Sequence, residues 1–188
     1  PISSQSHLIL TSYLLGMNDQ GLGFDIALHA GSLIAILIYY RDEIRKMLSV
    51  TDEGIRYFKL IIIGSIPFPL IGLLFIDIVS INMRSVTSIA LMTIVFALIL
   101  YIADVRKKEN IGSLASISMF TIIFIGFMQT LAIMPGVSRA GIVITAALLA
   151  NFNREDSIKI AFLLSIPAIF MATVYQSMQL YEIGNIEI

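Results

Sequence analysis

The sequence predicts an all-α, polytopic membrane protein, and two observations lead to this fold class. First, 57% of its 188 residues are hydrophobic and only 13% are charged, whereas soluble domains keep about a quarter of their residues charged. Second, the apolar residues form long runs, close to the roughly 20 residues that a helix needs to cross a bilayer. A chain in lipid must satisfy its own backbone hydrogen bonds, so these runs predict helices.

Apolar runs give the expected helices in chain order. They cover residues 22–40, 57–78, 85–103, 111–134 and 160–176. Two shorter apolar pieces, 8–17 and 140–152, are too short to cross the bilayer comfortably. Kinks, which membrane helices tolerate, are expected at Pro67, Pro69 and Pro167.

The basic residues predict which loops face the cytoplasm. Most of them follow the first run, follow the third run or precede the last run, whereas the loop between the second and third runs holds Arg84 alone. By the positive-inside rule the basic loops are cytoplasmic and the Arg84 loop faces outward. The net charge of −1 gives no indication of a nucleic-acid partner, and the lack of cysteine excludes disulfides and thiolate metal sites.

Arg139 lies apart from these loops, between two apolar runs, in a segment that reads MPGVSRAG from 134 to 141. An ionisable residue inside a membrane is costly and is a functional hypothesis by default. The alternative is that Arg139 only marks the end of a loop at the membrane surface.

An internal repeat emerges when the chain is compared with itself at an offset of 134 residues. The identical pairs are Pro1/Pro135, Ser4/Ser138, Thr11/Thr145, Leu14/Leu148, Leu15/Leu149, Ile26/Ile160 and Ala27/Ala161. In both copies a polar motif is followed by a short apolar piece and then by a full-length run. Paired short segments of this kind are typical of inverted-repeat membrane proteins and indicate their binding sites.

The repeat predicts the topology. Three full runs separate the copies, and an odd number of crossings inverts the second copy relative to the first. We therefore expect two re-entrant helical hairpins that enter from opposite sides, with polar tips that meet near the middle of the bilayer. One integral membrane domain is expected over 1–188, with repeat 1 at about 1–103 and repeat 2 at about 111–188. Further helices are expected before residue 1 and after residue 188.

The second tip, residues 134–141, combines features that bind phosphate. Pro135 and Gly136 break the preceding helix, so a new helix is expected to start near Ser138. The free N–H groups and positive dipole end of that helix favour an anion, and Arg139 adds a planar, permanently charged donor. Ser138 either donates to a phosphate oxygen or only caps the helix, and both roles stay open.

The first tip, residues 1–7, carries hydroxyl groups and a histidine. His7 lies three residues past Ser4 and is within reach across one helical turn. A Ser–His pair is the minimal arrangement for nucleophilic attack assisted by a base, although Ser3 or Ser4 can instead cap a helix. Opposite a buried Arg139, the pair predicts a phosphoryl-transfer site. Ser4, His7 and Arg139 are the expected catalytic residues, and Ser3, Gly136, Ser138 and Arg139 are the expected phosphate-binding residues.

Asp25 and His29 lie four residues apart on the first run and share one face of its helix. They could bind a metal or a proton. Polar residues inside membranes often serve as contacts between helices, and we favour this structural role. No metal ligand is therefore assigned among the residues present.

Both tips resemble the motifs of one known family. PISSQSHLIL at 1–10 resembles the serine/histidine motif of the undecaprenyl-pyrophosphate phosphatases, also called bacitracin-resistance proteins. PGVSR at 135–139 resembles the second signature of that family, PGxSRS. The segments FDIALHAG at 24–31 and GSIP at 64–67 are similar to its connecting stretches. The resemblance runs from Pro1 to about Gln176, with the motifs in the same order.

The resemblance implies a hydrolase of the inner membrane that converts undecaprenyl pyrophosphate to the monophosphate and so recycles the carrier lipid for peptidoglycan synthesis. It implies Ser4 as nucleophile, His7 as the motif histidine and Arg139 as the phosphate-binding arginine. It also implies a divalent cation, Mg²⁺ or Ca²⁺. The metal-associated glutamates of the family precede the matching proline, so we expect these ligands upstream of Pro1. A homodimer stays open.

Two positions depart from the family pattern. Ala140 stands where the family has a serine after the arginine, and Val143 stands where it has a threonine. An inverted-repeat transporter or lipid flippase is the alternative to an enzyme, because broken helices and a membrane arginine also serve alternating access. The pair of Ser4 and His7 favours the enzyme, since transport does not need it.

Overall fold

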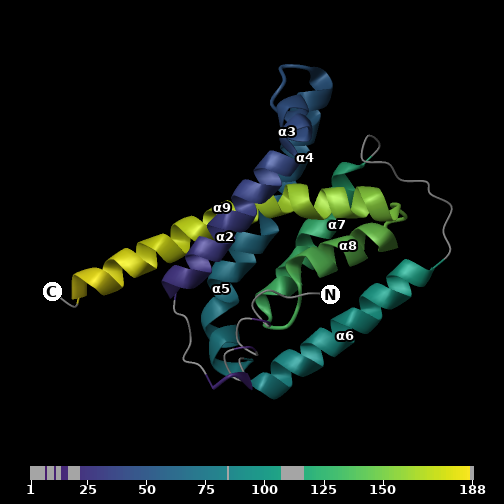
Figure 1. Ribbon diagram of the computed structural model, residues 1–188. Coiled ribbons are helices and arrows are strands. Elements are labelled where there is room, and N and C mark those ends of the chain that lie inside the picture. Colours follow the sequence, from purple (N-terminus) through teal and green to yellow (C-terminus); the bar gives the residue numbers. More distant parts are fainter. Residues whose placement is uncertain are drawn as a thin grey trace.

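The computed structural model describes residues 7, 11, 14–16, 22–83, 85–106 and 117–186, and within them every regular element is a helix (Figure 1). The helices are α2 (Leu22–Tyr39), α3 (Arg41–Met47), α4 (Asp52–Ser65), α5 (Pro67–Asn82), α6 (Val86–Val105), α7 (Met119–Gln129), the 3-10 helix η2 (Thr130–Ile133), α8 (Arg139–Leu149) and α9 (Arg154–Ile186). In this part of the chain the stretches long and apolar enough to cross a membrane are Asp52–Phe75, Val86–Val105 and Arg154–Tyr181. The predicted class, an all-α polytopic membrane protein, is confirmed.

Side-chain caps fix where several helices start. The hydroxyl oxygens of Thr51, Ser85 and Ser118 each accept a hydrogen bond of 3.1 Å from the backbone N–H three residues further on. Each cap satisfies one of the N–H groups that the first turn of a helix leaves without a partner. The starts of α4, α6 and α7 are therefore encoded locally, by residues that the sequence shows plainly.

The second predicted run is broken in the structure. The sequence predicts one span over 57–78, whereas α4 ends at Ser65 and α5 begins at Pro67. Pro67 lacks the backbone N–H that a continuous helix would use, so the expected kink becomes a helix boundary. The boundary places Phe68 in the first turn of α5, beside the second tip.

Helix α9 lies at the centre of the helix packing. It packs against α2, α4 and α8. It runs antiparallel to α2, because the rings of Tyr40 and Phe162 lie 5.9 Å apart at one end and a Cβ on Gly23 would lie 3.9 Å from Leu180 at the other. Buried apolar side chains of α4, α7, α8 and α9 form the core around this helix, among them Leu60, Ile122, Val143, Ala146, Leu163 and Leu164.

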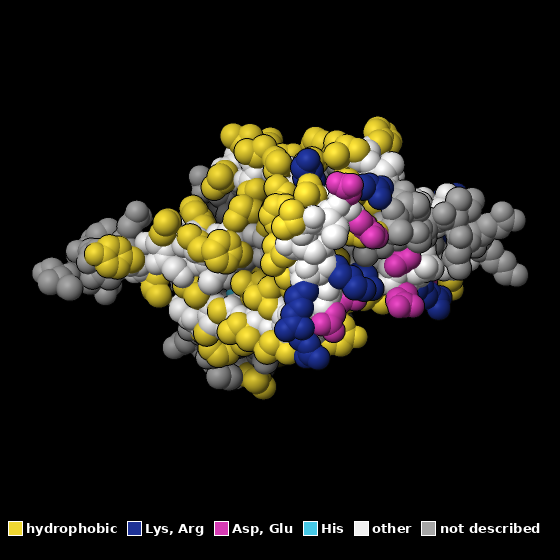
Figure 2. Space-filling model, turned by 90° about the horizontal axis from the view of Figure 1, so that it is seen from above, with side chains coloured by type: hydrophobic (Ala, Val, Ile, Leu, Met, Phe, Trp, Pro, Cys, Tyr) yellow, Lys and Arg dark blue, Asp and Glu magenta, His cyan; other side chains and the backbone are white. Residues whose placement is uncertain are grey.

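Charged and apolar side chains occupy different parts of the surface. Figure 2, seen from above relative to Figure 1, shows Lys, Arg, Asp and Glu side chains gathered over α3 and to its right, whereas hydrophobic side chains cover the left of the view. Along α6 large apolar side chains stay exposed, including Leu91, Ile94, Leu98 and Ile102. An apolar stripe of this extent fits lipid rather than water. The charged face lies at the end that the positive-inside rule assigns to the cytoplasm.

Candidate functional site

Helices α7, η2 and α8 form a hairpin whose two ends lie on the same side of the molecule (Figure 1). At its start, the Arg56 guanidinium of α4 donates a hydrogen bond of 2.8 Å to the Ile117 carbonyl. Just beyond its end, Arg154 makes a two-pronged ion pair with Asp104 of α6, at 2.6 and 2.8 Å. Both anchors lie at helix ends that the charge pattern assigns to the cytoplasm. Both ends of the hairpin therefore lie on one side of the molecule, as a re-entrant hairpin requires, and its entry into the membrane from the cytoplasmic side stays a prediction.

The backbone of the second tip packs tightly on α6. Gly136 has a φ of 96°, a left-handed conformation that glycine adopts without strain. A Cβ at this position would collide with the Ile89 carbonyl and lie 3.1 Å from the Thr93 hydroxyl. The Thr93 hydroxyl lies 2.8 Å from the carbonyl oxygen of Ile89 and 3.1 Å from that of Gly136, and its single proton can go to either. This contact fixes the tip against α6.

The contact with Ile89 and Thr93 also sets the depth of the tip. At a rise of about 1.5 Å per residue, these residues lie roughly 5–10 Å along α6 from Val86 and roughly 18–24 Å from Val105. The tip thus lies within the apolar length of α6. It lies between the end of α6 that is predicted to face outward and the middle of that helix.

Ser138 and Arg139 begin the returning helix α8. Ser138 is buried, and its hydroxyl oxygen accepts a hydrogen bond of 3.2 Å from the Gly141 N–H. This cap is one of the two roles that the sequence left open for Ser138. Its second role, as a donor to phosphate, stays a prediction.

Arg139 is half-buried and lies over an aromatic ring. Its guanidinium carbon is 5.8 Å from the centre of the Phe68 ring, a distance at which the face of the ring attracts a cation. Within the described residues no carboxylate lies at ion-pair distance from it. A cation among apolar helices without an acidic partner favours an anionic ligand. The placement favours this role over that of a residue that only marks a loop end at the surface, and phosphate binding by Arg139 stays a prediction.

Gln129 is a further polar residue of the hairpin, and the sequence reasoning overlooked it. It ends α7, its side chain is 0% exposed, and neither atom of its amide has a hydrogen-bond partner in the described part of the chain. The signal that could have found it is an amide side chain inside an apolar run, ten residues before Arg139.

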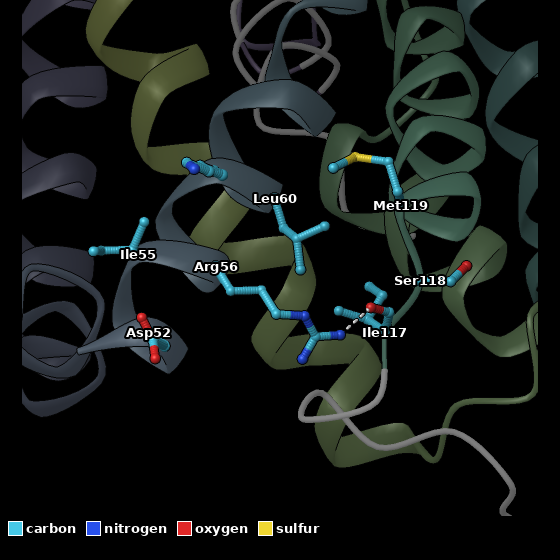
Figure 3. Close-up of a pocket in the computed structure, with 8 residues that line it drawn as sticks. Asp52, Ile55, Arg56, Leu60, Ile117, Ser118 and Met119 are labelled. Atoms are coloured by element: carbon cyan, nitrogen blue, oxygen red, sulfur yellow. Dashed lines mark hydrogen bonds between the residues drawn. The ribbon is translucent and has the colours of Figure 1, made fainter.

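A cavity of about 390 Å³ lies at the base of the hairpin and not at its tip (Figure 3). Asp52, Arg56 and Lys59 of α4 line it together with Ile117 and Ser118. Figure 3 shows Arg56 directed toward the Ile117 carbonyl, with Asp52 on the same helix. The carboxylate offsets part of the positive charge, and Arg56 is engaged in anchoring the hairpin. We therefore place the candidate site at the tip.

Comparison with known proteins decides the family. The chain matches the family described as bacitracin resistance protein BacA over residues 1–187. The chain belongs to this family. Curated relatives named undecaprenyl-diphosphatase include those of Saccharophagus degradans (42% identical over 99% of this chain and 73% of the relative), Teredinibacter turnerae (43%, 96% and 71%) and Elusimicrobium minutum (47%, 93% and 68%). The resemblance inferred from the two tips is confirmed.

The structure describes only some of the other predicted site residues. Ser3 and Ser4 lie outside the described residues, so the pairing of Ser4 with His7 and its approach to Arg139 stay predictions. His7 itself is helical and exposed. On α2, the Nδ1 atom of His29 is buried without a hydrogen-bond partner in the described part, and the side chain of Asp25 lies outside that part.

A metal site is not formed by the residues that the structure describes. Among them, no group of three or more His, Cys, Asp or Glu side chains could hold a metal ion. The donor set of the second tip, a guanidinium and backbone N–H groups, binds anions and not cations. The expected Mg²⁺ or Ca²⁺, with ligands upstream of Pro1, stays a prediction.

Proposed function

We propose that this protein hydrolyses undecaprenyl pyrophosphate to the monophosphate and that its second tip binds the diphosphate. The curated relatives named undecaprenyl-diphosphatase support this activity. The observation that carries the proposal is the guanidinium of Arg139, which lies at the start of α8 without an acidic partner among the described residues. Phosphoryl transfer depends on this kind of positioning and charge neutralisation.

The residues of the two tips have different roles in the reaction. Arg139 and the first N–H groups of α8 hold the diphosphate oxygens and stabilise the charge that develops on them. The nucleophile is Ser4 or a water molecule, and His7 accepts its proton. The bond between the terminal phosphorus and the bridging oxygen breaks, and the lipid monophosphate leaves. If Ser4 attacks, a phosphoserine forms and water then hydrolyses it.

The cellular setting follows from the substrate. We infer a multi-pass protein of the inner membrane that recycles the carrier lipid for peptidoglycan synthesis, as the family resemblance implies. The exposed apolar side chains of α6, such as Leu91 and Ile94, offer a lipid-facing surface beside the tip. A homodimer remains an open prediction. The contact of the tip with Ile89 and Thr93, in the half of α6 that is predicted to face outward, supports access of the substrate from the outer side.

Phosphate release from a polyprenyl pyrophosphate by the purified full-length protein tests the proposal. We expect release by the wild type and a loss of about 100- to 1000-fold in Arg139→Ala, which corresponds to removing a main charge-stabilising donor. Arg139→Lys should recover only part of the rate, because an ammonium group lacks the planar fork. As a control, Arg106→Ala at the exposed end of α6 should keep wild-type activity.

Two results would contradict the proposal. Full activity of Arg139→Ala would exclude the role assigned to the guanidinium. No phosphate release by the wild type, together with movement of the lipid across liposomes, would favour the transporter or flippase.

A further inference from the structure

We propose that Gln129 is a second anion-binding side chain of the Arg139 site and that its amide N–H groups donate to the diphosphate of the substrate. This inference rests on the proposed function and adds a residue to its site. It is carried by the burial of Gln129, by the register of α7 on α4 and by the chemistry of the second tip.

The burial of Gln129 is the first step of the argument. Its side chain is fully buried, and within the described residues neither Nε2 nor Oε1 has a hydrogen-bond partner. More than about 90% of buried polar groups in folded proteins are hydrogen-bonded, and each exception calls for an explanation. In a membrane hairpin, an amide of this kind is suited to meet a polar ligand.

The register of two helices sets the level of Gln129 along the hairpin. Helices α4 and α7 run parallel, since Arg56 contacts Ile117 near their starts and Gly126 lies against the Gly64 backbone eight to nine residues further on. Gln129 lies one turn beyond Gly126, on the same face of α7.

The same register therefore brings Gln129 to the level of Pro67 and Phe68, at the break between α4 and α5. Phe68 is the residue whose ring lies under the guanidinium of Arg139. The amide and the guanidinium thus reach the same level of the hairpin. Both would face a diphosphate bound at the start of α8.

The chemistry of the tip explains what an amide adds there. A diphosphate presents more oxygen atoms than one guanidinium can bind, and the hydroxyl oxygen of Ser138 is engaged as a helix cap. Ala140 and Val143 contribute no hydroxyl group. The Nε2 of Gln129 carries two N–H donors and no charge. It can therefore bind phosphate oxygen without adding a second buried cation.

Gln129→Met tests the proposal, because methionine has nearly the shape of glutamine but no amide. We expect an unchanged or higher thermal midpoint, since an unsatisfied buried group is removed. We expect kcat/KM for polyprenyl pyrophosphate to fall by about 10- to 100-fold, the effect of one hydrogen bond to a charged group. Gln176→Met is the matched control: its Oε1 is also buried and unpartnered in the described part, but it lies on α9. It should keep the wild-type kcat/KM.

A second variant covers the case in which Gln129→Met does not fold. Gln129→Leu also removes the amide and adds no charge, so its kcat/KM should fall about as far as that of Gln129→Met. Wild-type kcat/KM in either folded variant would overturn the proposal and leave the proposed function intact.

Binding of inorganic pyrophosphate separates this inference from the proposed function. If the wild type releases no phosphate, the proposed function fails, and the rise in thermal midpoint on adding pyrophosphate becomes the readout. A rise in wild type and Gln176→Met that is lost in Gln129→Met would support the amide as an anion ligand. An equal rise in all three, or no rise in any of them, would overturn it.

Discussion

Gly136 holds a backbone conformation at which any side chain is unfavourable. Its φ of 96° and the nearby Ile89 carbonyl leave neither the conformation nor the space for a Cβ. Gly136→Ala should lower the free energy of unfolding by about 1–3 kcal/mol, the usual cost of such backbone strain, and should also reduce phosphate release. Thermal unfolding in detergent measures the first effect. Gly72→Ala is the control, because a Cβ on Gly72 meets nothing within 4 Å, and equal losses in both variants would contradict the argument.

Glu43 on α3 pairs with Lys159 on α9, with 3.1 Å between Oε1 and Nζ. The hydrogen bond from Lys159 lowers the pKa of Glu43 below its ordinary value of 4.5. Folding thus favours the ionised carboxylate. The resulting stabilisation is present above pH 4.5 and is lost as the pH falls through the lower pKa of the folded protein.

The pH dependence of Glu43→Gln checks this pairing. At pH 7 the variant should be less stable than the wild type by about 1 kcal/mol at most, as is usual for ion pairs near a surface. The difference in stability should shrink as the pH falls below about 4.5, because the Glu43 carboxylate of the wild type then becomes protonated and, like the glutamine of the variant, uncharged. Thermal midpoints measured from pH 7 to pH 3.5 report it. A difference that does not depend on pH would contradict the assignment.

Single residues could be predicted from the sequence only where their chemistry is unusual for their surroundings. Arg139 stands out as a cation between apolar runs, and Gly136 stands out after a proline. Gln129 was missed because its importance depends on burial and on its level beside Phe68, which are set by helix packing and not by local sequence. The pair of Ser4 and His7 stays a prediction.

The contact between α6 and the second tip is the element-scale feature most open to test. Thr93 can donate its hydroxyl proton to the Gly136 carbonyl, and Thr93→Val removes that donor while it keeps the shape. We expect a loss of about 0.5–1.5 kcal/mol in the free energy of unfolding and a lower kcat/KM, because the tip is held less firmly. Thr87→Val on the same helix is the control, since Thr87 is exposed. An unchanged kcat/KM in Thr93→Val would show that this contact does not position the tip for the reaction.

Elements were predicted well where a local signal ends them. The start of α8 near Ser138 follows from the Pro-Gly break and the serine cap. The run 57–78 was predicted as one helix because hydrophobicity alone does not separate a kink from a boundary, and the structure divides it at Pro67. The last run, 160–176, extends to Arg154–Ile186, since polar turns at helix ends carry no apolar signal.

Topology is the prediction that belongs to the whole molecule, and the chain is well suited to test it. It contains no cysteine, so single introduced cysteines report on one position each. Val50 is 94% exposed next to α3, and Thr87 is exposed near the start of α6. In intact cells, a maleimide that does not cross membranes should label Thr87→Cys and not Val50→Cys. The reverse pattern would invert the orientation.

Composition predicted the membrane class of the whole molecule because lipid demands apolar surfaces and internal hydrogen bonds. The second hairpin could also be predicted, since the apolar piece after its polar tip, 140–152, is too short to cross and the repeat gives it a counterpart at 8–17. The inverted repeat stays a prediction. The polar motif and the short apolar piece that begin its first copy precede residue 22, and most of these residues lie outside the described part of the chain. The break at Pro67 and the level of Gln129 depend on packing between helices, which a single sequence does not show.

The depth of the second tip along α6 has an electrical consequence. With α6 oriented as the charge pattern predicts, an anion that reaches Arg139 from outside crosses roughly 5–10 Å of a hydrocarbon layer about 30 Å thick. It therefore moves through about a sixth to a third of the transmembrane voltage. A full crossing costs about 2.3 kcal/mol per charge at 100 mV. An interior-negative voltage of about 100 mV therefore opposes this partial entry by about 0.4–0.8 kcal/mol per charge. An energised cell thus holds the substrate less tightly than a detergent micelle does.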